Sequence, residues 1–202
     1  MKAYDRRYFD RWYRDARRRV STRDDLARKV ALAISAAEYV LGRRVRSVLD
    51  VGCGEAPWRA ELKRLRPGVR YLGIDGSEYV VARYGRERNI RLGRFGALER
   101  LGLDGRYDLV VCADVLHYVT DAEARRGLPI LGRLVAGLAW IEVFTSRDDT
   151  VGDSVEYRAR TPRTVARWLR DAGLEPIGLC CFVPHATLAE LTAFERGVRG
   201  AE

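Results

Sequence analysis

The stretch Val48-Leu49-Asp50-Val51-Gly52-Cys53-Gly54-Glu55-Ala56 decides the fold that we predict for this chain. Residues 45–52 form a short apolar run that is rich in valine and ends in an acid and a glycine, which is typical of a buried parallel strand. Gly52 permits a tight turn, and Gly54 lets a ligand approach the backbone without meeting a Cβ atom. The stretch therefore predicts a strand, a glycine loop and a helix that border a ligand crevice.

A second acid follows at the end of the next predicted strand, residues 69–75. Asp75 lies 23 positions after Gly52, and an acid at about this distance can accept hydrogen bonds from both hydroxyls of a ribose. A dinucleotide site usually has a third glycine where this chain has Pro57, and the negative charge of Asp50 does not favour a pyrophosphate. The spacing therefore favours S-adenosylmethionine, which carries an ammonium and a sulfonium, over NAD.

Strands alternate with helices through most of the chain, which predicts right-handed crossovers and a mainly parallel sheet. A further strand is expected in the tail around Leu188–Phe194. The other predicted strands span residues 45–52, 69–75, 89–92, 106–114, 137–144 and 174–183. Helices are predicted at residues 4–19, from Ser21 or Thr22 to Leu41, and at 56–66, 77–85, 121–135 and 161–173.

Several segments resemble the motifs of class I S-adenosylmethionine-dependent methyltransferases. VLDVGCGEA resembles their motif I, YLGIDGSEYV the second motif and YDLVVCADVLHYV the fourth-strand motif. GLAWIEVF is similar to their fifth strand, and TPRTVARWLRDAGLEPIGL to a late helix and strand. The resemblance covers residues 45–182. It implies an enzyme with a Rossmann-like, doubly wound α/β fold: a mainly parallel seven-stranded sheet with helices on both faces, and an antiparallel strand near one edge.

The resemblance also implies where S-adenosylmethionine binds. Asp50 would orient the cofactor's amino group, directly or through water, and Asp75 would bind the ribose. The loop at residues 94–97 would border the adenine, although it lacks the acid that is common there in the family. The implied cofactor-binding residues are Asp50, Gly52, Cys53, Gly54, Asp75, Gly76, Phe95, Ala113 and Asp114, with Phe95 stacking on the adenine ring.

A general base is needed only if the methyl acceptor must lose a proton. His117, just after the fourth predicted strand, is the candidate, and a role in fixing the loop at a helix start is the alternative. Glu142, Asp114 and Tyr118 are lesser candidates. Asp108, at the start of its strand, is expected to be structural, and Cys53 to be a small buried side chain rather than a nucleophile. No metal site is predicted, because the chain has two histidines and no Cys-x-x-Cys pair.

Composition predicts one globular domain without a membrane-spanning segment. The chain has 202 residues, of which 47% are hydrophobic, and no apolar run approaches a membrane span. The N-terminus lacks a secretory signal, so the cytoplasm is the expected location. The net charge of +9 is concentrated in residues 1–47, which hold 14 Lys and Arg against 6 Asp and Glu. This extension could bind nucleic acid or form a solvated helix face, and the preference for arginine over lysine can reflect genome composition.

The methyl acceptor is predicted to be a small molecule. The chain has Cys-Ala-Asp-Val where amino-methylating nucleic-acid enzymes have Asn-Pro-Pro-Tyr-like sequences, and it has no cysteine pair for covalent pyrimidine methylation. An RNA or ribosomal methyltransferase and a non-catalytic cofactor-binding module are the alternatives. Residues 1–44 are predicted to be a helical lid over the core at 45–202, because unpatterned aromatics precede the core. The sequence does not predict the oligomeric state.

Overall fold

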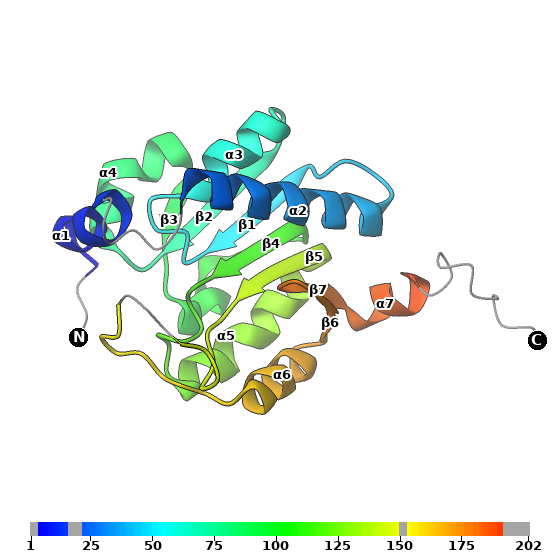
Figure 1. Cartoon of the computed structure of the whole chain (residues 1–202). Coiled ribbons are helices and arrows are strands. Elements are labelled where there is room, and N and C mark those ends of the chain that lie inside the picture. Colours follow the sequence, from blue (N-terminus) through cyan, green and yellow to red (C-terminus); the bar gives the residue numbers. More distant parts are fainter. Residues whose placement is uncertain (1–3, 16–21, 150–152, 192–202) are drawn as a thin grey trace, which may run out of the picture.

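The computed structural model describes residues 4–15, 22–149 and 153–191. One seven-stranded sheet runs through the molecule in the order β3-β2-β1-β4-β5-β7-β6, and helices cover both of its faces (Figure 1). The strand β7 is antiparallel to both of its neighbours, whereas the other neighbouring strands pair in parallel. The prediction of a doubly wound, mainly parallel sheet is therefore confirmed.

The strands are β1 (Ser47–Val51), β2 (Arg70–Asp75), β3 (Ile90–Leu92), β4 (Tyr107–Ala113), β5 (Val135–Glu142), β6 (Leu174–Gly178) and β7 (Cys181–Pro184). The helices are α1 (Arg6–Phe9), the π-helix η1 (Asp10–Arg14), α2 (Arg23–Leu41), α3 (Pro57–Leu65), α4 (Glu78–Arg88), the 3-10 helix η2 (Phe95–Leu101), α5 (Asp121–Leu134), α6 (Pro162–Asp171) and α7 (His185–Leu191).

Hydroxyl side chains begin four of these helices. Thr22 and Thr120 form capping boxes with the acid three residues later, and Ser77 and Thr161 accept a hydrogen bond from a backbone N–H of the first turn. A cap of this kind contributes about 1 kcal/mol to helix stability. The expected starts of α2 and α6 are confirmed.

Two apolar layers hold the helices onto the sheet. Within β4, Leu109 and Val111 face the layer that includes side chains of α2 and α3, while Val110 and Cys112 face the layer with α5 and α6. This alternation is the two-residue period of a strand buried on both faces. The helix α2 lies along the sheet (Figure 1) and buries four side chains in the same core, so it is part of the core of the fold.

Two predictions near the C-terminal end are wrong. Residues 174–183 form two antiparallel strands, β6 and β7, rather than one strand, because three successive residues at 178–180 adopt positive φ angles and reverse the chain. The tail forms the helix α7 where a strand was expected from Leu188, and Phe194 lies outside the described residues.

At the other end, the predicted helix at 4–19 is helical to Arg14, and residues 16–19 lie outside the described part. No helix among the described residues is long and apolar enough to cross a membrane.

Candidate functional site at the carboxyl ends of the strands

The glycine loop that follows β1 has the conformation that the sequence predicts. Gly52 and Gly54 have φ angles of +74° and +52°, and the backbone N–H groups of Gly52 and Cys53 donate hydrogen bonds to the carbonyl of Ile74 on β2. A Cβ atom on Gly52 would lie 2.2 Å from Cγ2 of Val115, in the loop after β4. Gly52 is therefore needed for close packing of two loops as well as for the turn.

Asp75 connects the ends of β1 and β2. Its Oδ2 accepts a hydrogen bond from the backbone N–H of Gly54 at 2.7 Å, and its Oδ1 accepts one from Ser77 N–H at 2.8 Å. Burial raises the pKa of this carboxyl above its usual value, while the two backbone donors act against that shift. Each carboxylate oxygen can accept a second hydrogen bond, so both remain able to receive a ribose hydroxyl. The predicted contact Gly76 follows directly and is exposed.

Asp50 lies deeper, beneath the glycine loop. Its carboxyl is 2% exposed and accepts a hydrogen bond from the hydroxyl of Tyr71 at 2.7 Å. Burial raises the pKa of Asp50 to about 7, and the Asp75 carboxylate adds to that shift while Tyr71 opposes it. The neighbouring Cys53 is also buried, and burial raises the pKa of its thiol. Cys53 is thus a small buried thiol, as the sequence predicts, and only its backbone is suited to a ligand contact.

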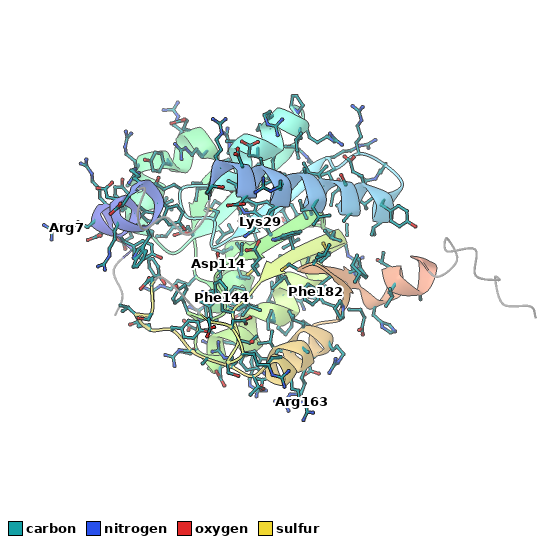
Figure 2. All side chains as sticks on the ribbon, viewed as in Figure 1. Arg7, Lys29, Asp114, Phe144, Arg163 and Phe182 are labelled. Carbon is teal, nitrogen blue, oxygen red and sulfur yellow. The ribbon has the colours of Figure 1, made fainter. Side chains whose placement is uncertain are left out.

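A third acid, Asp114, follows β4 at the same edge of the sheet. Its backbone has a φ of +60°, and its N–H donates to the carbonyl of Glu142 at the end of β5. Desolvation and the Glu142 carboxylate raise the pKa of Asp114 to about 6, whereas Lys29 opposes that shift. Lys29 comes from α2 and pairs with Glu142 at 2.6 Å, and Figure 2 shows its side chain above Asp114. Ala113, which precedes Asp114, is half-buried.

The N-terminal segment, residues 4–15, lies across this edge (Figure 1). The Ser77 hydroxyl donates to the Tyr4 carbonyl, and Arg14 pairs with Glu55 of the glycine loop at 2.5 Å. A Cβ atom on Gly54 would lie 3.2 Å from the hydroxyl oxygen of Tyr13 and 3.3 Å from the ring of Phe9. Burial of the hydroxyl, with the carboxyls of Asp75, Asp114 and Asp50 and the thiol of Cys53, raises the pKa of Tyr13. That hydroxyl therefore lies near all three acids, although the residue as a whole is 41% exposed.

His117 is buried at 1% exposure behind this edge. Its Nδ1 accepts a hydrogen bond from the backbone N–H of Phe144 at 3.4 Å, and its carbonyl accepts one from Arg158 N–H. Its ring also packs against Tyr118 and Tyr157. In the neutral ring, an Nδ1 that accepts a hydrogen bond leaves the proton on Nε2. This arrangement favours the loop-fixing alternative over the general base, because the basic nitrogen is already engaged.

The loop after β3 departs from its prediction. Phe95 is 6% exposed and begins η2, and its ring packs in the core, where a Cβ atom on Gly127 of α5 would lie 2.4 Å from ring atom Cε1. The ring is therefore used for packing and does not face the crevice as an adenine platform would. Arg126 donates to the carbonyl of Gly96, which also ties this loop to α5.

Sequence reasoning missed two contributors to the site. Tyr71 could have been found from strand periodicity, since residues 71, 73 and 75 point to one face of β2, the face of Asp75. Lys29 gave no signal, because it reaches Glu142 across 113 positions of sequence. Among the described residues, no group of three or more His, Cys, Asp or Glu is arranged to hold a metal ion.

The residues of this edge fit a cationic nucleoside cofactor. The described part of the chain places no Lys, Arg or His in an ion pair with Asp50, Asp75 or Asp114. Neighbouring acids that form no ion pair favour a positively charged ligand, although the Lys29 ammonium partly offsets the charge near Asp114. The backbone N–H groups of Gly52, Cys53 and Gly54 are already bonded within the protein, so the glycine loop offers a ligand close approach to the backbone, and the free lone pairs of Asp75 can accept hydrogen bonds from a ribose.

Comparisons with known proteins agree with this geometry. A family model described as a methyltransferase domain matches residues 5–193. A comparison with curated protein sequences finds no match.

Many solved structures share the fold. The sugar N-methyltransferase KedS8 from Streptoalloteichus sp ATCC 53650 superposes with a TM-score of 0.62 at 16% identity, over 77% of this chain and 82% of that one. The magnesium protoporphyrin IX methyltransferase ChlM from Synechocystis PCC 6803, with bound SAH, gives 0.56 at 19% identity, over 85% and 86%. The [4+2]-cyclase SpnF gives 0.59 at 22% identity, and this chain, of which 83% is covered, spans only 63% of that protein.

Proposed function

Since the chain belongs to the class I S-adenosylmethionine-dependent methyltransferase family, we propose that it transfers the cofactor's methyl group to a small-molecule acceptor. The observation that carries this proposal is the set of three acids at the carboxyl edge of the sheet, with raised pKa values and no ion-pair partner among the described residues. When bound, the cofactor supplies an electrophilic methyl group on its sulfonium. The protein has to bind and orient the two reactants.

The proposed cofactor contacts follow the three loops of this edge. The backbone of Gly52, Cys53 and Gly54 lies against the methionine part, and Asp50 orients the amino group. Asp75 binds the ribose through the free lone pairs of its two oxygens, and Gly76 leaves room beside it. Ala113 and Asp114 line the methionine end. Phe95 is left out, because its ring is buried against α5.

Asp114 is the better-placed group where the acceptor must lose a proton. Asp114 is an exposed residue at this edge of the sheet, and a pKa of about 6 leaves its carboxyl mostly ionised at neutral pH and able to accept a proton. His117 is proposed to fix the surrounding loops, since its ring contacts Tyr118, Phe144 and Tyr157. An acceptor that carries no proton to lose would need neither group as a base.

Ion pairing supports a small-molecule acceptor over RNA. Six of the 14 Lys and Arg residues before Ser47 form ion pairs with acids of the described residues, which lowers the value of these six for binding phosphates. The described basic residues of this region that pair with an acid are Arg6, Arg14, Arg23, Arg28, Lys29 and Arg43. The matched structures also include enzymes named for a sugar and a porphyrin substrate. A cytoplasmic location is part of this proposal.

Of the predicted lid at residues 1–44, the segment 4–15 is proposed to act as a lid, as its aromatic residues suggest, whereas α2 packs in the core. Phe9 is 2% exposed and stacks on Tyr79 of α4 at 5.9 Å between ring centroids. Arg14 and Tyr13 reach the glycine loop. These contacts join the lid to the glycine loop and to α4, the helix that follows Asp75.

Calorimetry with S-adenosylmethionine and with its demethylated product tests cofactor binding directly. A labelled-methyl screen of metabolites and RNA then tests transfer, and it matters because the same fold is found in a protein named as a cyclase. Transfer to a metabolite supports the proposal. Transfer to RNA, with binding that falls steeply as salt rises, would favour the RNA alternative. Cofactor binding without transfer to either pool would favour a non-catalytic module.

A further inference from the structure

We infer that Tyr71 is a positioning residue for the cofactor's amino group, because its hydroxyl orients the buried Asp50 carboxyl beneath the glycine loop and favours its ionised form. This inference rests on the proposed function and adds one residue to the same site. Tyr71 itself does not reach the crevice, since its side chain lies in the core on β2 at 5% exposure. It would act on the cofactor only through Asp50.

The contact between the two side chains is short and shielded from solvent. The hydroxyl of Tyr71 donates to Oδ2 of Asp50 at 2.7 Å, and both residues are buried. The parallel pairing of β1 with β2 sets Asp50 opposite Gly73, which leaves Tyr71 two residues earlier on the same face of β2. A hydrogen bond to a carboxylate is among the stronger ones in proteins, and an unpaired buried carboxylate is costly.

Local packing fixes the position of the Tyr71 hydroxyl. The side-chain amide of Asn89 donates to the Tyr71 carbonyl at 2.6 Å. A Cβ atom on Gly73 would lie 2.7 Å from Sγ of Cys53 and 3.2 Å from the Tyr71 hydroxyl oxygen. Gly73 therefore leaves the space in which the phenol reaches the acid, and any larger residue there would push it away.

No charged donor competes with Tyr71 for Asp50 among the described residues. The titratable groups that face this acid are the carboxyl of Asp75, the thiols of Cys53 and Cys112, and the hydroxyls of Tyr71 and Tyr13. All of them are neutral or negative at pH 7. A bound ammonium group would thus be the first cation near Asp50, and it binds best when this acid is ionised.

Tyr71→Phe tests the inference because it removes a single oxygen atom. Affinity for the demethylated cofactor product is measured by calorimetry between pH 6 and 8.5. Loss of the donor raises the pKa of Asp50, so binding should weaken about tenfold at pH 6 if that pKa rises by about one unit, and the loss should shrink as the pH rises. The ligand's own amino group titrates equally with both proteins. Tyr39→Phe, at an exposed position of α2, is the matched control and should change nothing.

A double-mutant cycle separates positioning from a general loss of structure. In an Asp50→Asn background there is no carboxylate to hold, so Tyr71→Phe should add less than about a twofold loss. A loss that does not depend on pH, or one that persists in the Asp50→Asn background, would overturn the inference.

Carbon NMR of the Asp50 carboxyl in the free protein, wild type and Tyr71→Phe, provides a readout that needs no ligand. An Asp50 pKa that is higher in Tyr71→Phe than in the wild-type protein supports the inference, and equal Asp50 pKa values in the two proteins contradict it. The two proposals fail differently. Wild-type protein that binds neither cofactor form overturns both, whereas normal cofactor binding by Tyr71→Phe at every pH overturns only the role of Tyr71.

Discussion

Acids at the two edges of the sheet differ in their hydrogen-bond partners, and their pKa values are shifted in opposite directions. At the amino ends of the strands, Asp108 accepts two hydrogen bonds from Arg43 at 2.9 and 2.8 Å and one from Arg46 N–H at 2.7 Å. These donors lower its pKa even though burial acts against them. At the carboxyl ends, Asp50 and Asp75 receive no arginine or lysine from the described residues, and burial raises the pKa of each.

The difference distinguishes an acid that stabilises the fold from acids that are available to bind a ligand. A buried acid whose pKa is lowered adds stability above its unfolded pKa of about 3.9, and the contribution is lost as the pH falls. An acid whose pKa is raised, such as Asp50, makes folding less favourable as the pH rises from about 4 to about 7. Acids kept at such a cost are typical of functional sites.

Asp75→Ala changes an acid at the carboxyl ends of the strands and should have the largest effect of the proposed variants, a loss of cofactor affinity. Removal of both carboxylate oxygens leaves ribose hydroxyls unpaired, so we expect a loss of about 1–3 kcal/mol in S-adenosylmethionine affinity. Calorimetry measures it, with Asp108→Asn as the control because Asp108 is remote from the cofactor edge. An unaltered dissociation constant in Asp75→Ala would refute the assignment of Asp75 to the ribose. It would also remove the main evidence that the acids at the carboxyl ends of the strands bind a ligand.

Asp108→Asn should have the next largest effect, on folding rather than on binding. Substitution by the neutral amide weakens the two bonds to Arg43 and the bond to Arg46 N–H, so urea unfolding at pH 7 should show a loss of about 1–2 kcal/mol. Because the pKa of Asp108 is lowered in the fold, the difference from wild type should disappear as the pH falls through that pKa. A difference that stays constant down to pH 2 would mean that the ion pair contributes nothing.

Tyr13→Ala tests whether the lid contributes to cofactor binding. The variant removes the hydroxyl that lies near the three acids and the ring contact with Phe9 at 5.1 Å between centroids. We expect cofactor affinity to fall by about 1 kcal/mol, the scale of one aromatic contact, while the unfolding midpoint of the core changes little. Tyr39→Ala is the matched control on the exposed face of α2. Equal affinities for wild type and Tyr13→Ala would leave the segment without a role in the site.

The sequence predicts the acids and glycines at the carboxyl ends of the strands far better than it predicts the contacts at the amino ends or in the lid. Asp50, Gly52, Gly54 and Asp75 are readable because a bare backbone and a strand-terminal acid require particular residue types at fixed spacing. The pairing of Lys29 with Glu142 was not readable, because it depends on how α2 crosses the sheet. Phe95 shows the limit of the motif, since an aromatic residue beside the adenine loop packs equally well inward.

The turn between β6 and β7 shows that not every feature at an edge of the sheet has to serve ligand binding. Leu179 and Cys180 adopt φ angles of +49° and +63° although neither is a glycine, so the preceding Gly178 alone gave a weak sequence signal for the turn. Leu179→Asn with Cys180→Gly supplies the residues that such a turn prefers and should raise the free energy of unfolding by about 0.5–1 kcal/mol. Leu179 is 74% exposed, so little burial is lost. Cofactor affinity should be unchanged in the same protein. A more stable protein that binds the cofactor less well would mean that this strained turn, like the unpaired acids, is kept for the ligand.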